Sequence, residues 1–385
     1  MRDGVPGRTL GPDLNCLVRP ATRPGPSRLR SRWRALKSGR TKSAQRKSAA
    51  EAIAKRAPRR RGTIRASRPL SGVVIRRYLD DALDGIREAR SAIIVAALVV
   101  NWRRWDLTID AVESLLRAET AACEPSLRLC IYVLDNESDG PLRPQWPDNV
   151  TLLTSPKNLG YGGGNNLLAS RALRDYPQLD ALFVLNNDAT VEPAALSRLI
   201  EAMMSSPEVG VVGPLLVLPD GSLESCGGHF GLTRAWWTQF RPEHRVDFVS
   251  GAALLVRRQA WEAVGGFDER YFHYAEDIDF AIKVGQHGWR SIVAPDARVV
   301  HQKSQAPTTE WRLAYYKIRN LILFARQHRR LRLLGCNSIV NALRVLVPVR
   351  HLLRGQFAEA RWAWHGLCDG VRGVTGPLLP KNPRA

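Results

Sequence analysis

The chain has 385 residues, of which 44% are hydrophobic and 24% are charged, and its formal net charge is +21. These values are typical of a globular protein with a sizeable core, and they exclude a collagen, a coiled coil and a wholly disordered chain. A charge of +21 would suggest nucleic acid or an anionic membrane as a partner if it were spread over the folded part.

The positive charge is instead concentrated in residues 1–75. This segment holds 20 Lys and Arg against three acids, so it carries +17 and leaves +4 for the rest of the chain. It has no sustained apolar period, and we predict a disordered basic tail. Its interpretations stay open: a bare solvated tail, an arm for nucleic acid or anionic lipid, a transit-like segment, or upstream sequence included through a wrongly assigned start codon. Because the remaining chain is nearly neutral, no specific nucleic-acid partner is expected.

Strands and helices are predicted to alternate from residue 93 onward. Continuous apolar runs predict strands at 93–101, 127–134, 150–154 and 181–185. Apolar residues at helical spacing predict one helix after the first strand, and a second helix is expected at 165–174. This alternation predicts an α/β fold with a mostly parallel central sheet. Polar clusters follow several of these strands, at the sheet edge where such folds bind ligands.

The second half continues with a strand, a helix, an acidic helix and two short strands. Their predicted ranges are 248–256, 259–264, 276–287, 291–294 and 298–301. Beyond residue 309, Arg residues interleave with Leu, Val and Ile, which predicts amphipathic helices that either lie at a membrane interface or pack on the preceding domain. We therefore expect three parts: the tail at 1–75, an α/β domain at 90–308 and a C-terminal helical region at 309–385.

The cysteine pattern and the hydropathy of the chain indicate the cellular compartment in which the protein is expected. The six cysteines are scattered without a C-x-x-C pair, which is typical of free thiols in a reducing compartment. No run of about 18 apolar residues is present to span a membrane. We expect a cytoplasmic protein that can lie peripherally on the inner face of the plasma membrane.

A glycine-rich segment, NLGYGGGNN at 158–166, follows the third predicted strand. Backbone N–H groups at the start of a helix can approach a phosphate closely where glycines remove the side chains. The dinucleotide fingerprint G-x-G-x-x-G fails here because Asn165 occupies the position of its last glycine. The segment is therefore either a phosphate loop or a tight structural turn.

Carboxylates are found at two places. Asp188 follows Asn186 and Asn187 directly after a buried strand, where it could bind a divalent cation or simply cap a helix. Glu276, Asp277 and Asp279 open the acidic helix, where the helix dipole tolerates them. Close carboxylates in a partly buried cleft also raise one another's pKa, which suits a general base.

A histidine ends the last predicted strand. His301 follows the apolar pair Val299 and Val300. A lone histidine at a strand end usually has only a local partner, but imidazole is also a good ligand for Mn²⁺ beside a carboxylate and a diphosphate.

Taken in order, these segments resemble the inverting family 2 glycosyltransferases and, within them, the rhamnosyltransferase-like branch. The similarity runs from about Ala96 to Gly376. The matching segments are VVNW at 99–102, DNESDG at 135–140, NLGYGGGNN at 158–166, LNND at 185–188, SGAALLVRR at 250–258, GGFDE at 265–269, FHYAEDID at 272–279, VH at 300–301, YYKIRN at 315–320 and GLCDGVRG at 366–373.

The resemblance implies a GT-A fold that binds a nucleoside diphosphate sugar across the ends of the first strands. It places Asp135 at the nucleotide base. The other residues that it places along the nucleotide-sugar site are Asn101, Asn158, Gly160, Asn165, Asn186 and Asp188. The family's metal motif often has two aspartates, but the first position here is Asn186, so Asp188 and His301 are the implied ligands of Mn²⁺ or Mg²⁺.

The resemblance also implies an inverting single displacement in which a base takes the proton of the acceptor hydroxyl. Asp277 falls on the family's catalytic base, and Glu276 is expected to position the acceptor or the base. Asp279 and Tyr274 are expected to contact the acceptor or to support the local structure.

The donor and acceptor follow from the resemblance only at the level of the branch. They are dTDP-rhamnose and a glycan or polyprenyl-linked acceptor in cell-envelope polysaccharide synthesis, with an anionic membrane surface as a further partner. Two other functions stay open: a sugar nucleotidyltransferase, for which the sugar nucleotide is the product, and an inactive GT-A binding module.

Overall fold

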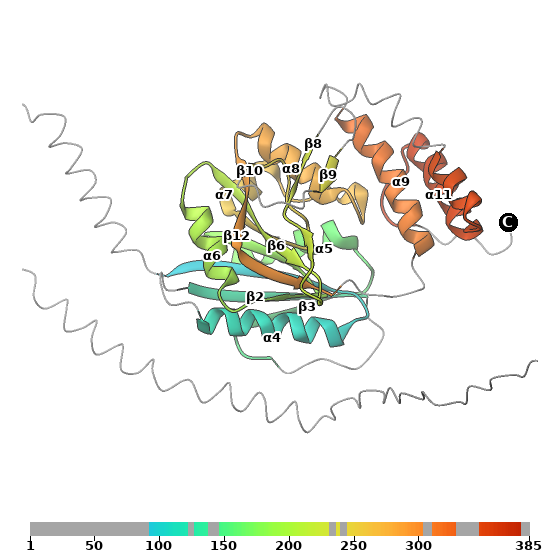
Figure 1. The fold of residues 1–385 in the computed structure, drawn as a ribbon. Coiled ribbons are helices and arrows are strands. Elements are labelled where there is room, and N and C mark those ends of the chain that lie inside the picture. Colours follow the sequence, from blue (N-terminus) through green and yellow to red (C-terminus); the bar gives the residue numbers. More distant parts are fainter. Residues whose placement is uncertain are drawn as a thin grey trace, which may run out of the picture. The chain divides into compact units, whose positions relative to one another are not determined.

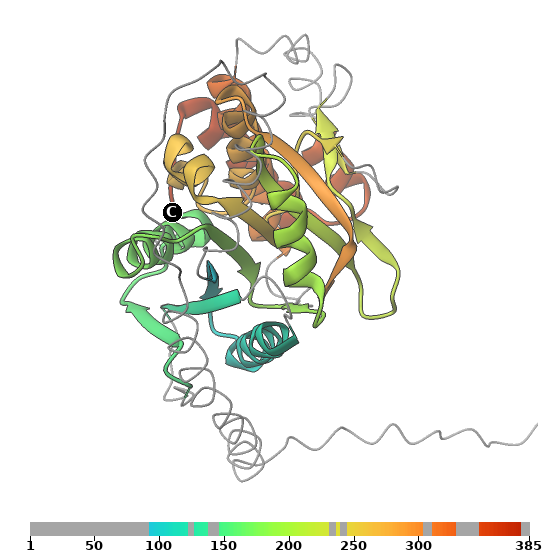
Figure 2. The same ribbon diagram turned by 90° about the vertical axis from the view of Figure 1, so that its left-hand side faces the viewer.

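A twisted sheet with helices on both faces forms the centre of the structure, a computed structural model (Figures 1 and 2). It describes residues 92–121, 127–137, 146–230, 236–238, 245–302, 310–328 and 346–378. The predicted basic tail lies outside the described residues. Ten strands form the main sheet, whose principal path is β10-β12-β6-β11-β4-β1-β2-β3.

The strands are β1 (Ile93–Asn101), β2 (Leu127–Asn136), β3 (Val150–Ser155), β4 (Ala181–Asn186), β5 (Ala189–Val191), β6 (Val209–Val217), β7 (Leu223–Ser225), β8 (Gly228–Phe230), β9 (Trp236–Thr238), β10 (Arg245–Val246), β11 (Ala253–Arg257) and β12 (Arg290–His301). The helices are α4 (Trp105–Ala121), α5 (Gly160–Asp175), α6 (Ala195–Met204), α7 (Arg258–Val264), the short 3₁₀ helix η2 (Glu269–Tyr271), α8 (Glu276–Gln286), α9 (Glu310–Gln327) and α11 (Phe357–Arg372), and residues 346–353 are also helical.

The first half of the sheet is parallel, as predicted. Strands β3, β2, β1 and β4 run in one direction, β11 is antiparallel to β4 and β6, and β12 runs parallel to β6. Successive side chains of β1 point to opposite faces of the sheet, so they pack against the helices on the two faces in turn. Ile94, Ala96 and Leu98 share a core with Leu168 of α5 and Phe280 of α8. Helices α4 and α6 pack together on strands of the same sheet. The predicted α/β class with a mostly parallel central sheet and C-terminal helices is confirmed.

Three predicted boundaries are wrong. Helix α5 begins at Gly160 rather than at residue 165, and β11 begins at Ala253 rather than at 248. Strand β12 is continuous where two short strands are expected, because Pro295 and Asp296 lie at a bulge between Ala294 and Arg298 rather than at a turn. Strands β5 to β10 are not predicted from the apolar pattern of the sequence.

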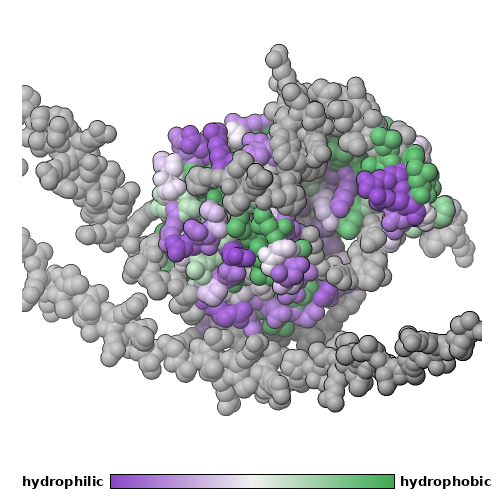
Figure 3. Space-filling model, in the orientation of Figure 1, coloured by the Kyte–Doolittle hydropathy of each residue, from purple (hydrophilic) through white to green (hydrophobic). Residues whose placement is uncertain are grey.

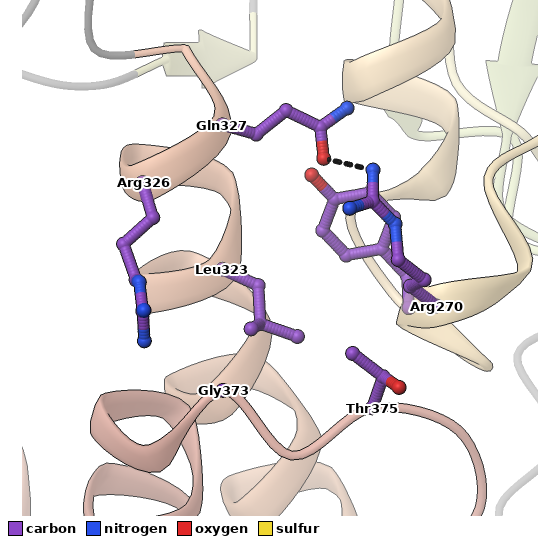
Figure 4. A pocket seen from close by; sticks show the side chains of 7 residues that line it. Arg270, Leu323, Arg326, Gln327, Gly373 and Thr375 are labelled. Atoms are coloured by element: carbon purple, nitrogen blue, oxygen red, sulfur yellow. Dashed lines mark hydrogen bonds between the residues drawn. The ribbon is translucent and has the colours of Figure 1, made fainter.

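The C-terminal helices α9 and α11 pack side by side at one end of the molecule (Figures 1 and 2). A cavity of about 260 Å³ lies where η2, α9 and the turn after α11 meet. Figure 4 shows Arg270 reaching Gln327 of α9 across this junction, at 2.6 Å. No helix in the described ranges is both long enough and apolar enough to cross a bilayer.

Candidate functional site

Polar residues gather at the carboxyl ends of the parallel strands. Strand pairing places Asn101 of β1 opposite Asp135 of β2, and Val100 opposite Asn186 of β4. Asn101 is fully buried, and its Oδ1 accepts hydrogen bonds from Arg104 N at 3.1 Å and Thr108 Oγ1 at 2.9 Å. Asn101 therefore fixes the start of α4, while Asp135 and Asn186 lie along the same edge of the sheet.

Asp188 and His301 are brought together by the pairing of β5 with β12, which places His301 opposite Ala189. His301 Nε2 lies 3.2 Å from Asp188 Oδ1, and its Nδ1 lies 2.8 Å from Glu224 Oε2. Burial alone would lower the pKa of His301, but the hydrogen bonds to the two carboxylates outweigh it and raise this pKa to about 9. Glu224, which is not predicted from the sequence, is thus a third member of the cluster formed by Asp188 and His301.

The same residues are suited to a divalent cation. Asn186 Oδ1 is buried without a hydrogen-bond partner, and Asn186 Nδ2 lies 3.4 Å from His301 Nε2. Carboxylate and amide oxygens with one imidazole form a donor set that suits Mn²⁺ or Mg²⁺, and a carboxylate on the other imidazole nitrogen is the usual support for such a ligand. Within the described ranges no three His, Cys, Asp or Glu side chains surround one point, so a cation would need ligands from its substrate as well.

The glycine-rich segment is tied to the end of β2. Asn158 Oδ1 accepts hydrogen bonds from Gly160 N at 2.8 Å and from Asn136 Nδ2 at 3.0 Å. Asn136 Oδ1 in turn accepts from Leu159 N at 2.8 Å. Asn158 thus holds the turn between β3 and α5 beside the functional edge of the sheet.

Close packing explains the glycines of this segment. A Cβ on Gly160 would lie 2.3 Å from Phe272 O, and the φ of Gly160 is +76°. A Cβ on Gly164 would lie 3.0 Å from Val100. Asn165 is fully buried, and its Nδ2 donates to Tyr161 O at 3.0 Å. The glycines bring α5 close to the sheet, and Asn165 lies inside the helix rather than on the loop surface.

The Glu276–Asp277 pair begins α8. Asp277 Oδ2 accepts from Gly251 N at 2.9 Å, and its Oδ1 accepts from Ile278 N at 2.8 Å. Glu276 is 5% exposed, and its Oε2 has no hydrogen-bond partner. Burial, followed by the charge of Asp277, raises the pKa of Glu276 to about 8. Burial also raises the pKa of Asp277, while its two backbone donors lower it. With a pKa of about 8, Glu276 is protonated at neutral pH, and Asp277 is the member of the pair whose carboxylate accepts backbone hydrogen bonds.

Two buried tyrosines, Tyr161 and Tyr274, are each influenced by the charges of Asp188, Glu276 and Asp277. Burial raises the pKa of Tyr274 to about 12, with further contributions from the charges of Glu276, Asp188 and Asp277. The pKa of Tyr161 is raised by burial and by the same three carboxylates. Tyr161 also donates its hydroxyl to Gly251 O at 2.5 Å. All three carboxylates thus lie within electrostatic reach of both hydroxyls, and Tyr161 and Gly251 join the site although the sequence analysis did not select them.

The segment that leads into Glu276 has an unusual backbone. Phe272, Tyr274 and Ala275 have φ values of 64°, 72° and 75°. Side chains other than glycine and asparagine rarely adopt this region, at a cost of about 1–3 kcal/mol each. Such strain persists only where the surrounding contacts fix it, and here it lies directly before the buried carboxylates.

Asp279 lies on the other side of α8. It is fully buried, with Oδ1 2.7 Å from His328 Nε2 and 3.0 Å from Gln327 Nε2, and Oδ2 2.7 Å from Lys283 Nζ. These contacts tie α8 to the end of α9. The structure therefore separates Asp279 from the other acids of its motif.

Comparison with known proteins shows similarity to glycosyltransferases. The family described as glycosyl transferase family 2 matches residues 96–244, and glycosyl transferase family group 2 matches residues 181–372. An N-acetylglucosaminyl-diphospho-decaprenol L-rhamnosyltransferase of Mycobacterium tuberculosis is 35% identical over 186 residues, which are 41% of this chain and 60% of the relative. The O-antigen biosynthesis protein RfbC of Myxococcus xanthus is 28% identical over 248 residues, 57% of this chain and 19% of that protein.

Among solved structures, the mannosyltransferase PcManGT from Pyrobaculum calidifontis in complex with GDP-Man and Mn²⁺ matches with a TM-score of 0.44 and 15% identity. The match covers 73% of this chain and 88% of that one. GalNAc-T7 with UDP, GalNAc and Mn²⁺ matches with a TM-score of 0.43 and 14% identity, over 59% of this chain and 50% of that one.

Proposed function

Because the chain belongs to the family 2 glycosyltransferases, in the rhamnosyltransferase-like group, we propose that it transfers a sugar from a nucleoside diphosphate sugar to a hydroxyl acceptor with inversion at the anomeric carbon. The chain spans 60% of the length of the mycobacterial rhamnosyltransferase that it matches. The observation that carries the proposal is that Asp188 is paired with His301 at the end of the sheet, while Gly251 joins Asp277, through its N–H, to the hydroxyl of Tyr161, through its carbonyl.

Asp277 is the proposed catalytic base. The acceptor oxygen forms a bond to the anomeric carbon as the bond from that carbon to the diphosphate oxygen breaks, and the hydroxyl proton passes to Asp277. Gly251 N and Ile278 N hold the carboxylate in place, and the raised pKa of Glu276, about 8, keeps that neighbouring carboxyl protonated at neutral pH. Tyr274, beside these carboxylates, is proposed to contact the acceptor.

Asp188 and His301, with Asn186, are the proposed ligands of Mn²⁺ or Mg²⁺. Such a cation, when bound, neutralises charge on the departing diphosphate. Glu224 keeps the imidazole oriented through Nδ1, and His301 must give up its Nε2 proton to bind a metal. Asp135, Asn101 and the turn held by Asn158 are proposed to line the nucleotide end of the donor.

The proposed donor is dTDP-rhamnose and the proposed acceptor is a lipid-linked glycan. The mycobacterial relative is an N-acetylglucosaminyl-diphospho-decaprenol L-rhamnosyltransferase, which supports the rhamnosyl group of the donor and the lipid-linked acceptor. An assay of the full chain with dTDP-rhamnose, UDP-glucose and GDP-mannose, each with a polyprenyl diphosphate N-acetylglucosamine acceptor, tests this. A glycolipid product from one donor supports the function, whereas donor binding without any product supports a binding-only module.

The C-terminal helices favour a membrane surface as a further partner. On α11, Phe357, Trp364 and Val371 recur every seven residues and are 70%, 53% and 57% exposed, beside the exposed Arg361 and Arg372. The opposite face of α11, which includes Ala360, Ala363 and Gly366, is buried. Phe and Trp beside Arg on one exposed face are typical of helices that lie in the interface of an anionic bilayer.

The helical residues 346–353 continue this surface. Leu346 and Leu353 are 57% and 84% exposed, and Arg350 and Arg354 are exposed beside them. Figure 3 shows hydrophobic and hydrophilic surface side by side over the C-terminal helices at the right of the molecule. The chain is thus proposed to bring its site to the membrane that carries a lipid-linked acceptor.

Vesicle sedimentation tests the membrane contact. Because the basic tail also attracts anionic lipid, the comparison is between wild type and a Phe357→Ser, Trp364→Ser variant on vesicles of phosphatidylcholine with phosphatidylglycerol. The variant is expected to bind more weakly, and Met204→Ser, which removes an apolar side chain 44% exposed on α6, is expected to bind like wild type. Equal binding of wild type and the double variant would contradict this part of the proposal.

A further inference from the structure

Two neighbouring residues of α9, Arg319 and Asn320, contact the strained segment in front of the proposed base. Both side chains are fully buried. Asn320 Nδ2 lies within hydrogen-bond distance of three backbone carbonyl oxygens, those of Tyr271 at 2.9 Å, His273 at 2.7 Å and Tyr274 at 2.7 Å, so its two hydrogens are shared among three acceptors. One amide group therefore binds most of the carbonyls of a four-residue stretch.

Arg319 supports Asn320 and the same stretch. Its Nε donates to Asn320 Oδ1 at 2.9 Å, which fixes the orientation of the amide, and its Nη2 donates to Tyr271 O at 2.7 Å. Its Nη1 donates to Gly376 O at 2.5 Å, and Gly376 N donates back to Arg270 O at 3.0 Å. The turn after α11 is thereby closed onto η2, at the junction drawn in Figure 4.

The charge of Arg319 is not used for a salt bridge within the described part of the chain. Its guanidinium contacts carbonyl oxygens and lies 4.9 Å from the ring centroid of Tyr316 and 5.4 Å from that of Tyr315. A buried charge without a carboxylate partner is costly unless its hydrogen bonds serve a particular geometry. The geometry that these bonds fix is that of residues 271–274.

The segment is also held from the opposite side. Tyr161 N of α5 donates to Phe272 O at 2.8 Å, and Gly160 leaves room for that carbonyl. The Phe272 ring stacks on Tyr316, with 5.4 Å between the centroids. Residues 271–274 are thus contacted by α5 on one side and by α9 on the other. They lie immediately before Ala275, Glu276 and Asp277.

We propose that Arg319 and Asn320 are positioning residues that hold segment 272–275, with its three positive φ values, and thereby place the Asp277 carboxylate for proton transfer; this rests on the proposed transferase function. Without the amide of Asn320, the carbonyls of His273 and Tyr274 lose this donor, that of Tyr271 keeps only its bond from Arg319 among the two side chains, and the strained φ values relax toward ordinary ones. The start of α8 then moves, and the carboxylate leaves its place beside Gly251 N. Neither residue touches the reacting atoms, so the donor is bound as before.

The test compares Asn320→Ala and Arg319→Lys with Ile322→Ala in the full chain. Ile322 is 1% exposed and packs between α9 and α11, so its truncation destabilises the same helix without touching the segment. Amide hydrogen exchange of residues 271–277, nucleotide affinity, kcat and KM are measured for each variant. Arg319→Lys keeps the positive charge but loses the planar guanidinium with its several N–H donors. This variant is expected to fold and to lower kcat by less than Asn320→Ala does.

We expect Asn320→Ala to lower kcat about 100-fold with nucleotide affinity unchanged, because a displacement of about 1 Å costs this much. Exchange of residues 271–277 is expected to accelerate in Asn320→Ala and not in Ile322→Ala. The inference is overturned if exchange there is unchanged, or if kcat follows the loss of thermal stability equally in all three variants. If the wild-type chain shows no turnover, the proposed transferase function is contradicted. Hydrogen exchange needs no substrate, so it still tests whether Asn320 and Arg319 hold residues 271–277.

Discussion

The two acidic halves of the site differ in how their charge is balanced. Asp188 is matched by His301, which also binds Glu224, so two carboxylates share one imidazole. Asp277 accepts hydrogen bonds from backbone N–H groups, Glu276 Oε2 is buried without a hydrogen-bond partner, and the pKa of both carboxyls is raised by burial.

This difference separates two kinds of chemistry that the same residue type can perform. A carboxylate next to an imidazole stays ionised and is suited to a cation and a diphosphate. Burial raises the proton affinity of a carboxylate, which suits a base that accepts a proton from a hydroxyl.

The largest effect is expected for Asp277→Asn, which removes the proposed base and keeps the shape of the side chain. Turnover should fall about 10³-fold, a typical contribution of a general base. Nucleotide binding should stay close to wild type, and the thermal midpoint should fall only modestly, because the amide oxygen can still accept one of the two bonds from Gly251 N and Ile278 N. Steady-state kinetics with parallel calorimetry measures both, and wild-type turnover in this variant would remove Asp277 from the mechanism.

Glu224→Gln addresses the other half. The variant keeps a hydrogen bond to His301 Nδ1 but removes the charge that supports the imidazole. Loss of such a support typically weakens metal binding about 10–100-fold. Titration of Mn²⁺ in the presence of nucleotide measures the change. Glu192→Gln is the control, since Glu192 lies 3.6 Å from Arg298 and is 47% exposed, and an equal loss there would show that the effect is not specific.

Gly251→Ala should displace the base without removing it. A Cβ at this position would lie 3.1 Å from Asp277 Cβ and 3.2 Å from Oδ2, so one of them must shift by a few tenths of an ångström. We expect kcat to fall about 10-fold with unchanged donor affinity. Gly285→Ala, on α8 with open space around it, is the matched control and should keep wild-type kcat. Equal kinetics of the two variants would show that the Gly251 contact does not position Asp277.

The smallest effect is a change in the pH dependence of stability in Glu276→Gln. The pKa of Glu276 is about 8 in the folded state and near its ordinary value of 4.5 when unfolded. Between these values the folded state binds the extra proton, so wild-type stability should fall as pH rises, by at most about 1.4 kcal/mol per pH unit. The variant should lose this slope. Denaturant unfolding from pH 5 to 8 measures it, with the half-exposed Glu262→Gln as control, and parallel curves for wild type and Glu276→Gln would contradict the raised pKa.

The sequence predicts the local parts of the fold well. β1 and α4 are predicted because their apolar patterns depend only on neighbouring residues. The start of α5 is missed because four glycines disfavour a helix, and only close packing on Val100 and Phe272 outweighs that propensity. The break predicted at Pro295 is absent because β12 pairs with β6 on both sides of a bulge.

The candidate site is predicted to the extent that its residues lie in contiguous motifs. Asp188, His301, Glu276 and Asp277 can be selected from the sequence. Glu224 cannot, because it reaches His301 only through the pairing of β7 with β6, which no local pattern indicates. Gly251 contributes a backbone N–H, which carries no sequence pattern at all.

Calorimetry of the full chain with UDP, dTDP and GDP, each with and without Mn²⁺, tests the central claim most directly. The account predicts that one nucleotide binds, that its affinity rises when Mn²⁺ is present, and that Asp188→Ala abolishes this increase while the variant stays folded. The absence of metal-dependent binding of any of the three by the folded wild-type chain would contradict the proposed transferase site.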